Sequence, residues 1–487
     1  MKTALRDQDT SHHQTIPESS PSETTSLAGR TSDKQIPVLD GARAIACLGV
    51  LSMHLSFHAG QERIWKPLHG VHDVPGMLAF FAATLGYAGY SGIILFFLLS
   101  SFLLFLPYAK ALLLEGPWPS PHRFYLRRIF RILPGYYATI LLMILFFHPE
   151  LLHSSHWHEV WLFLTFRIGS QLSGQLNGPF WTLPIEFQFY LLLPIIVWLF
   201  SLIVCRGTLH WRLLKLTLCL LVMVAWGLLT RYWGMYIAPT AKLDFLIPHT
   251  LSMTLVPLIY GDPGQSINEG KYFEVFAIGM LICTVYTYTR YATCAEPWRI
   301  RLGRLSPMMF ITGLALLSFL SFWYFYINFY IAEGMDQSFF PTHPKVHVVL
   351  TSLTSIVLRH WAEWHTLAYA LGYGLCMVAL LYGSARLKRP FESSVLRWIA
   401  SISFSLYMWH FNLMSLFVTV PLVNLRREGW SSLMLYGAFW CWTLIIILPI
   451  SAMLYRWIEL PGIRLGERLI RKLTNLGPES PRHSCGG

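Results

Sequence analysis

Residues 92–109, GIILFFLLSSFLLFLPYA, decide the fold class of this chain. The stretch carries no charged side chain. An α-helix rises about 1.5 Å per residue, so this stretch is about 27 Å long as a helix. The hydrocarbon core of a bilayer is about 30 Å thick, and apolar runs of this length are typical of transmembrane helices. The stretch therefore predicts a helix that crosses a membrane.

Comparable apolar runs recur on both sides of this stretch. Of the 487 residues, 54% are hydrophobic and 13% are charged, whereas about 25% of residues in soluble globular domains are charged. This composition excludes an ordinary soluble enzyme and a disordered chain. The sequence predicts an all-α integral membrane protein with about ten transmembrane helices. The expected spans lie near residues 44–62, 84–109, 130–148, 185–204, 215–232, 272–290, 305–330, 366–384, 398–420 and 433–455.

The distribution of basic residues predicts the orientation of the chain. The formal net charge is +12, and the basic residues cluster between the apolar runs. No cluster is interleaved with aromatic residues, so we expect no nucleic-acid partner. With the N-terminus in the cytoplasm, most Lys and Arg residues fall on the cytoplasmic side, as the positive-inside rule requires. We therefore expect both termini inside, in a multi-pass protein of the cell (plasma or inner) membrane.

Three segments follow from this pattern. Residues 1–36 are polar and contain no apolar run, which predicts a disordered cytoplasmic tail. Residues 37–465 are expected to form the transmembrane domain. Residues 466–487 are expected to be a short basic cytoplasmic tail.

Two polar residues of the first span are candidates for function. His54 lies 11 positions beyond Arg43, about 16 Å along a helix. A charged residue in the middle of a span costs roughly 2.5–3.5 kcal/mol on insertion scales, so such residues are usually functional. A hydrogen-bonded packing role is the alternative for His54. His58, one turn further on, is a second candidate on the same face.

A pair of arginines marks the third span. Arg128 and Arg131 are three positions apart in FYLRRIFRILPGYY and share a helix face, while Arg127 points elsewhere. Guanidinium groups bind phosphate and thioester oxygens better than Lys does. The alternative is a positive-inside anchor.

Further polar residues lie in the fourth and ninth spans. Glu186 begins the apolar run of WTLPIEFQFYLLLP and is either a functional acid or an interfacial cap. Tyr407 and His410 are one helical turn apart and are candidates for lining one cavity. The histidines of HPELLHSSHWHE (148–159) lack the spacing of a metal site, so we expect no metal.

Four sequence blocks resemble the membrane acyltransferase-3 family of polysaccharide and antibiotic O-acyltransferases. The family places an Arg and a His in its first span with ten residues between them, as Arg43 and His54 are placed, and its RxxR motif matches Arg128 and Arg131. The blocks are LDGARAIACLGVLSMH (39–54), LFFLLSSFLLF (95–105) running on to FYLRRIFRILPGYY (124–137), FWTLPIEFQFYLLLP (180–194), and SFSLYMWH (403–410) followed by YRWIELP (455–461).

The chain departs from the family pattern at two places. The usual SGF of the second span is Ser100-Ser101-Phe102, and the usual pair of acids before QFY is Glu186-Phe187. Glu186 is therefore the only acid at that position.

The resemblance implies an acyltransferase that moves an acyl group, with acetyl expected, from cytoplasmic acyl-CoA to a hydroxyl of a cell-envelope glycan, a glycolipid or a secondary metabolite. Acyl-CoA is then a substrate, and no bound cofactor is expected. Arg128 and Arg131 would hold the donor, and Arg43 would neutralise a phosphate or polarise the thioester carbonyl.

The chemistry of the remaining candidates agrees with this implication, and for His54 it favours the general base. His54 would be the general base or a transient acyl carrier, and Glu186 would orient His54 or bind sugar hydroxyls. Tyr407, Trp409 and His410 would line the acceptor cavity. Arg456 and Glu459 are expected to form a structural clasp. The competing class is a transporter or flippase of a lipid or saccharide, for which repeated halves would be typical; none is evident in the sequence.

Overall fold

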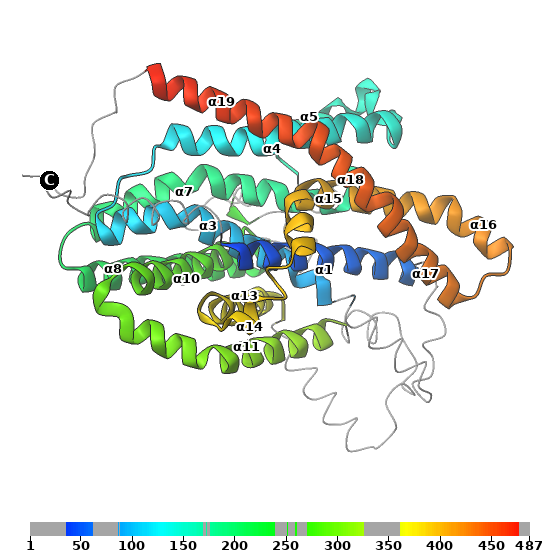
Figure 1. Ribbon diagram of the computed structural model, residues 1–487. Helices are drawn as coiled ribbons and strands as arrows, with labels where there is room; N and C mark the ends of the chain where they lie inside the picture. Colours follow the sequence, from blue (N-terminus) through cyan, green and yellow to red (C-terminus); the bar gives the residue numbers. More distant parts are fainter. Residues whose placement is uncertain are drawn as a thin grey trace, which may run out of the picture. The chain divides into compact units, whose positions relative to one another are not determined.

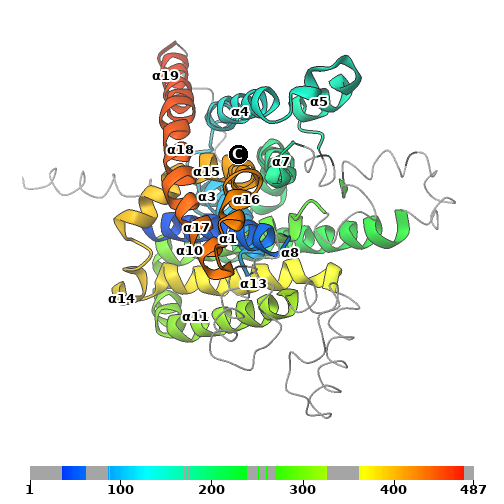
Figure 2. The same ribbon diagram turned by 90° about the vertical axis from the view of Figure 1, so that its right-hand side faces the viewer.

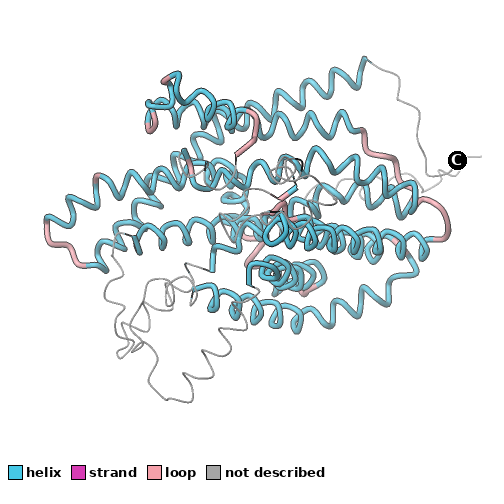
Figure 3. Tube along the Cα trace, turned by 180° about the vertical axis from the view of Figure 1, so that it is seen from behind, coloured by secondary structure: helices cyan, strands magenta, loops and turns pink. Residues whose placement is uncertain are grey.

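The computed structural model describes residues 36–61, 88–168, 176–238, 270–325 and 361–476, together with Gly86, Leu172, Leu251, Ile259 and Tyr260. No residue in these ranges lies in a β-strand, and the elements are helices joined by short loops (Figures 1 and 3). The all-α prediction is confirmed. The predicted tail 1–36 lies outside the described residues except for Ile36, and so do residues 477–487.

A helix lies at each segment that was expected to span the membrane. The long helices are α1 (Pro37–Gln61), α3 (Gly92–Leu114), α4 (Pro121–Phe146), α7 (Thr182–Val204), α8 (Leu209–Tyr232), α10 (Phe273–Tyr291), α11 (Glu296–Phe325), α13 (Trp361–Tyr382), α15 (Ser394–Thr419) and the succession α17 (Ser432–Trp442), η11 (Thr443–Ile447), α18 (Leu448–Leu454), η12 (Tyr455–Glu459) and α19 (Leu460–Leu476). The short ones are η2 (Gly89–Ser91), η3 (Pro149–Leu152), η4 (Ser154–His156), α5 (Trp157–Leu164), η5 (Gly178–Trp181), η6 (Trp233–Ile237), η8 (Thr293–Ala295), α14 (Ala385–Lys388) and α16 (Pro421–Arg427).

Within the described residues, 9 helices are long and apolar enough to cross a membrane. Helix α10 is not among them, although it coincides with the expected span 272–290. It packs against α3, α8 and α13 (Figure 1), and most of its side chains are buried, including Glu274 and Thr287. A helix enclosed by protein needs less apolar surface than one that faces lipid, which explains its composition. Which side of the membrane each terminus faces stays a prediction.

Helix α10 approaches α3 closely because Gly279 has no side chain. A Cβ atom at Gly279 would lie 1.9 Å from the Ser101 Oγ and 2.5 Å from the Leu98 carbonyl oxygen. The Ser101 hydroxyl itself donates to that carbonyl at 3.0 Å. Ser101 stands where the family pattern has glycine, so Gly279 on the facing helix provides the space that the serine occupies.

An ion pair is buried where α8, α10 and α13 meet. Arg231 Nη2 donates to Glu274 Oε1 at 2.8 Å, and the two side chains are 2% and 1% exposed. The Thr366 hydroxyl donates to the same oxygen at 2.9 Å. Two glycines make room for the pair. A Cβ atom at Gly227 would lie 2.6 Å from Glu274 Oε2, and one at Gly270 would lie 3.0 Å from Arg231 Cζ. This polar cluster therefore joins three helices at one level.

Helices α1 and α15 run side by side in the same direction. The Cys47 thiol contacts the Ser403 carbonyl oxygen at 3.6 Å, and His54 contacts His410 at 3.0 Å. The two contacts are seven residues apart on both helices, so one face of α1 follows one face of α15. This pairing brings the first and fourth sequence blocks together.

The last long helix contains two π-helical turns, η11 and η12, and continues into α19 (Figures 1 and 2). A π-turn inserts one extra residue and rotates everything that follows about the helix axis. Helix α19 then lies along α4, with Gly462 beside Pro134 and Gly466 beside Phe130. The helix runs through the predicted boundary at residue 465, and the predicted segment limits stay predictions.

Candidate active site

His54 is held by two hydrogen-bond acceptors. Its Nδ1 atom lies 3.0 Å from the Val50 carbonyl oxygen, one turn earlier on α1, and 3.0 Å from His410 Nε2. A carbonyl oxygen only accepts, so we assign the ring proton of His54 to Nδ1. The Nε2 atom then carries a lone pair, and it has no hydrogen-bond partner among the described residues.

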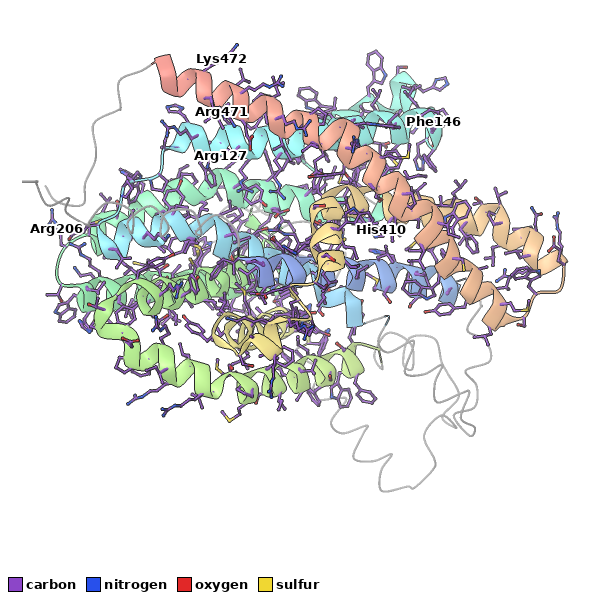
Figure 4. All side chains as sticks on the ribbon, in the orientation of Figure 1. Arg127, Phe146, Arg206, His410, Arg471 and Lys472 are labelled. Atoms are coloured by element: carbon purple, nitrogen blue, oxygen red, sulfur yellow. The ribbon has the colours of Figure 1, made fainter. Side chains whose placement is uncertain are left out.

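His410 is the second histidine of the pair, and it lies in the interior of the bundle (Figure 4). Its Nδ1 atom donates to the carbonyl oxygens of Tyr407 at 2.8 Å and Leu406 at 3.1 Å. The Nε2 atom of a neutral His410 is therefore the acceptor that faces the His54 N–H. A base oriented at one ring nitrogen and free at the other is the arrangement that general-base catalysis requires.

His58 lies one turn beyond His54 and does not belong to this pair. It is 7% exposed, and its Nε2 atom has no hydrogen-bond partner within the described ranges. Its ring centroid lies 4.9 Å from that of Phe411, which also lies 5.2 Å from His54. Phe411 therefore packs against both imidazoles.

Three arginines, one from α1 and two from α4, lie close together. Arg43 is on the face of α1 that also carries His54, nearer the start of the helix; this face is called the Arg43–His54 stripe. Arg43, Arg128 and Arg131 lie within electrostatic reach of one another. Among the described residues Arg43 has only Asp40 as an ion-pair partner, at 3.6 Å, and Arg131 has no hydrogen bond. The Arg128 guanidinium lies 5.8 Å from the Tyr190 ring centroid, and its buried Nε is unpartnered. Three guanidinium groups with so few partners form a site suited to an anion.

Glu186 belongs to this arginine cluster rather than to the histidine pair. Its Oε1 atom accepts hydrogen bonds from the Ser100 hydroxyl at 2.6 Å and from the Tyr190 hydroxyl. Arg43 and Arg128 lie within electrostatic reach of it. Of the two roles predicted for Glu186, a contact with His54 is not formed: the partners of the His54 ring are Val50 and His410.

Tyr407 and Trp409 direct their polar atoms at neighbouring helices. The Tyr407 hydroxyl forms a hydrogen bond with Thr182 Oγ1 at 2.7 Å and donates to the Pro179 carbonyl oxygen at 3.0 Å. Trp409 Nε1 donates to Thr139 Oγ1 at 3.1 Å. The structure thus shows both side chains fastening α15 to its neighbours, and their role toward an acceptor stays a prediction.

The histidines after α4 pair with nearby acids. His148 lies 3.0 Å from Glu150, and His156 lies 3.1 Å from Glu159. The pKa of Glu150 is lowered by a hydrogen bond from the Glu150 backbone N–H and by the His148 imidazole. The described residues contain no group of three His, Cys, Asp or Glu placed to hold a metal ion.

A family model described as an acyltransferase domain matches residues 36–456. The chain belongs to the acyltransferase-3 family. The predicted resemblance is confirmed, and the match covers both the histidine pair and the arginine cluster. The transporter and flippase alternative is accordingly set aside in favour of an acyltransferase.

One relative of this acyltransferase-3 protein is the peptidoglycan O-acetyltransferase OatA of Listeria monocytogenes serovar 1/2a (strain ATCC BAA-679 / EGD-e). It is 23% identical over an alignment of 466 residues, and the match covers 89% of this chain and 56% of the relative. The chain thus spans about half the length of the curated relative that it matches. No solved structure is significantly similar to the chain.

Glu459 is an acid of this acyltransferase-3 site that the sequence did not assign to it. The expected clasp with Arg456 is not formed within the described residues: Arg456 is exposed, whereas Glu459 is 2% exposed. Glu459 accepts from the Ser405 hydroxyl at 3.0 Å and lies within electrostatic reach of Arg131 and Arg43. It ends the π-turn η12, so its direction depends on a rotation that sequence spacing does not predict.

Proposed function

We infer that this acyltransferase-3 protein transfers an acetyl group from acyl-CoA to a hydroxyl of a cell-envelope glycan, in the cell membrane. The observation that carries the proposal is the His54–His410 pair, which leaves a basic nitrogen at His54 Nε2. That nitrogen shares a stripe of α1 with Arg43, which belongs to the arginine cluster. The similarity to a peptidoglycan O-acetyltransferase supports a peptidoglycan sugar as the first acceptor to test.

The proposed reaction uses His54 as a general base. The acceptor oxygen attacks the thioester carbonyl carbon while its proton passes to His54 Nε2, and the carbon–sulfur bond then breaks. The sulfur leaves as the thiol of CoA after it receives the proton from His54, so the imidazole returns to its neutral form. The His410 Nε2 lone pair stabilises the His54 imidazolium in between.

The alternative route gives His54 a covalent role. Its Nε2 atom attacks the thioester, the CoA thiol leaves, and the acyl group then passes from the imidazole to the acceptor hydroxyl. Incubation of the enzyme with labelled acyl-CoA in the absence of acceptor, followed by denaturation, separates the routes. Label that stays on a His54 peptide supports the carrier. Absence of label, from enzyme that transfers rapidly once acceptor is added, supports the base.

The arginine cluster is the proposed site of the donor phosphates. Arg43 and His54 are 11 residues apart on α1, so phosphates bound at the arginines lie about 16 Å along the axis from the base. The pantetheine arm of an acyl-CoA separates its phosphates from its thioester and would lie along this stripe. Glu186 and Glu459 would then hold the guanidinium groups in place.

Replacing Arg128 by glutamine is expected to raise the KM for acyl-CoA about 10- to 100-fold, because a charge-assisted hydrogen bond contributes about 1.5–3 kcal/mol. The turnover number is expected to change little. Arg127→Gln is the matched control, since Arg127 neighbours Arg128 but is exposed. Steady-state kinetics with varied acyl-CoA measure both values, and an equal rise in both variants would contradict a specific donor site.

Replacing His410 by alanine is expected to lower kcat by at least about tenfold, because loss of an orienting partner leaves the base in the wrong tautomer or rotamer. The KM for acyl-CoA is expected to stay within about twofold, since the arginine cluster is untouched. His158→Ala, at an exposed histidine, is the control. Unchanged kcat in His410→Ala would show that the histidine pair does not serve catalysis.

The whole proposal is tested by acetyl transfer in isolated cell envelopes. Membranes that contain the protein are supplied with radiolabelled acetyl-CoA, and label is followed into the peptidoglycan, other glycan and lipid fractions. Label above the empty-vector control identifies the acceptor class. Label in none of the fractions, with the protein present at normal amounts, would overturn the proposed donor or acceptor.

A further inference from the structure

Helix α19 has a buried side and an exposed basic side. Gly462, Gly466 and Ile470 are buried, and a Cβ atom at Gly466 would lie 2.6 Å from the Phe130 Cβ on α4. The other side carries exposed basic side chains, bordered by Leu465, which is 49% exposed; Leu473, near the end of the helix, is 58% exposed. The exposed basic residues of α19 are Arg464, Arg468, Arg471 and Lys472.

The basic face of α19 is continuous with the first turns of α4. Gly462 meets Pro134 and Gly466 meets Phe130, so the two helices are antiparallel and the end of α19 lies beside the start of α4. Figure 4 shows Arg471 and Lys472 on α19, with Arg127 on α4. Arg123 and Arg127 are exposed there and bring the exposed basic residues to six.

Acidic residues do not balance this charge. Glu467 is the only acid in the two helices, and its carboxylate lies 4.0 Å from Arg471, which is 80% exposed. The remaining basic side chains of the face require mobile or bound anions. Because α4 is long and apolar enough to cross a bilayer and Leu465 borders the basic face, lipid headgroups are the anions that fit this face best.

We propose that α19 and the first turns of α4 form a binding site for anionic phospholipids. The exposed arginines and Lys472 bind the headgroup phosphates, while Leu465 lies among the acyl chains. Amphipathic helices with basic and leucine faces bind membranes in this way. Each basic residue near an anionic surface strengthens binding by about fivefold. The proposal is independent of the proposed transfer reaction.

The full-length protein in phosphatidylcholine nanodiscs, with or without phosphatidylglycerol, tests the site. The variant Arg464→Gln/Arg468→Gln/Arg471→Gln/Lys472→Gln removes the basic face of α19. The matched control is Arg304→Gln/Arg386→Gln/Arg389→Gln/Arg397→Gln, which removes four exposed arginines elsewhere. Retained lipid is measured by native mass spectrometry, and thermal unfolding is followed in both bilayers.

We expect wild type and control to retain phosphatidylglycerol and to unfold at a higher temperature when it is present. The α19 variant is expected to retain at least about tenfold less phosphatidylglycerol, and its unfolding temperature is expected not to rise when this lipid is present. Equal retention in the α19 variant and wild type would overturn the proposal. So would an equal shift of wild type with soluble glycerol phosphate, which would show that a free phosphate suffices.

Discussion

Replacing His54 by alanine is expected to abolish acyl transfer, with a fall in kcat of about 10²- to 10⁴-fold, the range that a positioned general base contributes. The Nε2 lone pair is the group that the acceptor hydroxyl needs, and alanine removes it together with the bond to His410. Donor binding is expected to persist, because the arginine cluster lies at the other end of the stripe. Transfer from labelled acetyl-CoA and binding of unlabelled CoA, on the same purified protein, measure both effects.

Two further variants make the His54 result specific. His58→Ala removes a buried histidine on the same helix that has no bond to His410, and it is expected to keep most of the activity. His54→Ala/His410→Ala is expected to be no slower than His54→Ala, because the two imidazoles act as one unit. Full activity of His54→Ala would move the catalytic assignment to His58 or His410.

Replacing Arg231 by methionine is expected to lower the free energy of unfolding by about 3–5 kcal/mol, because Glu274 is left as an unpaired buried charge. Glu274→Gln removes the buried carboxylate that balances the Arg231 charge and is expected to have a similar effect. The pair joins three helices, so the loss affects the bundle as a whole. Unfolding of the purified protein, followed by circular dichroism in mixed micelles of increasing denaturing detergent, measures the change.

The double variant Arg231→Met/Glu274→Gln separates the charge from the contacts. It removes both charges and keeps an acceptor for the Thr366 hydroxyl, so it is expected to be more stable than either single variant. Arg212→Met is the control, since its partner Glu115 is 63% exposed and solvent weakens that pair. Single variants as stable as wild type would show that the buried pair does not hold these helices together.

Much of the fold could be predicted because transmembrane helices are a local property. The run 92–109 satisfies its backbone hydrogen bonds within itself and is apolar enough for lipid, so its sequence alone places α3. The stripe of α1 that carries Arg43 and His54 follows from helical spacing in the same way. Helix α10 shows the limit of this reasoning. Its polar residues are explained by its burial among three helices, and the composition of the segment does not reveal that burial.

The candidate site could be predicted only in part. Helical spacing placed Arg128 and Arg131 on one face, but it did not predict that Glu186 would lie beside them with Ser100 and Tyr190. Glu459 was assigned to a clasp with Arg456, and the π-turn η12 turns it toward the arginines instead. A single extra residue in one helical turn decides this contact.

The helices, their order and the faces that carry Arg43, His54 and the paired arginines follow from the sequence alone. Which side chains meet across helices depends on the tertiary packing. His54 and His410 are 356 residues apart in the chain, and α1 and α15 must pack in one register for their nitrogens to lie 3.0 Å apart. The physical reason is the range of the interactions: hydrophobicity and backbone hydrogen bonding form a helix from neighbouring residues, whereas the register between helices depends on side-chain packing along both of them.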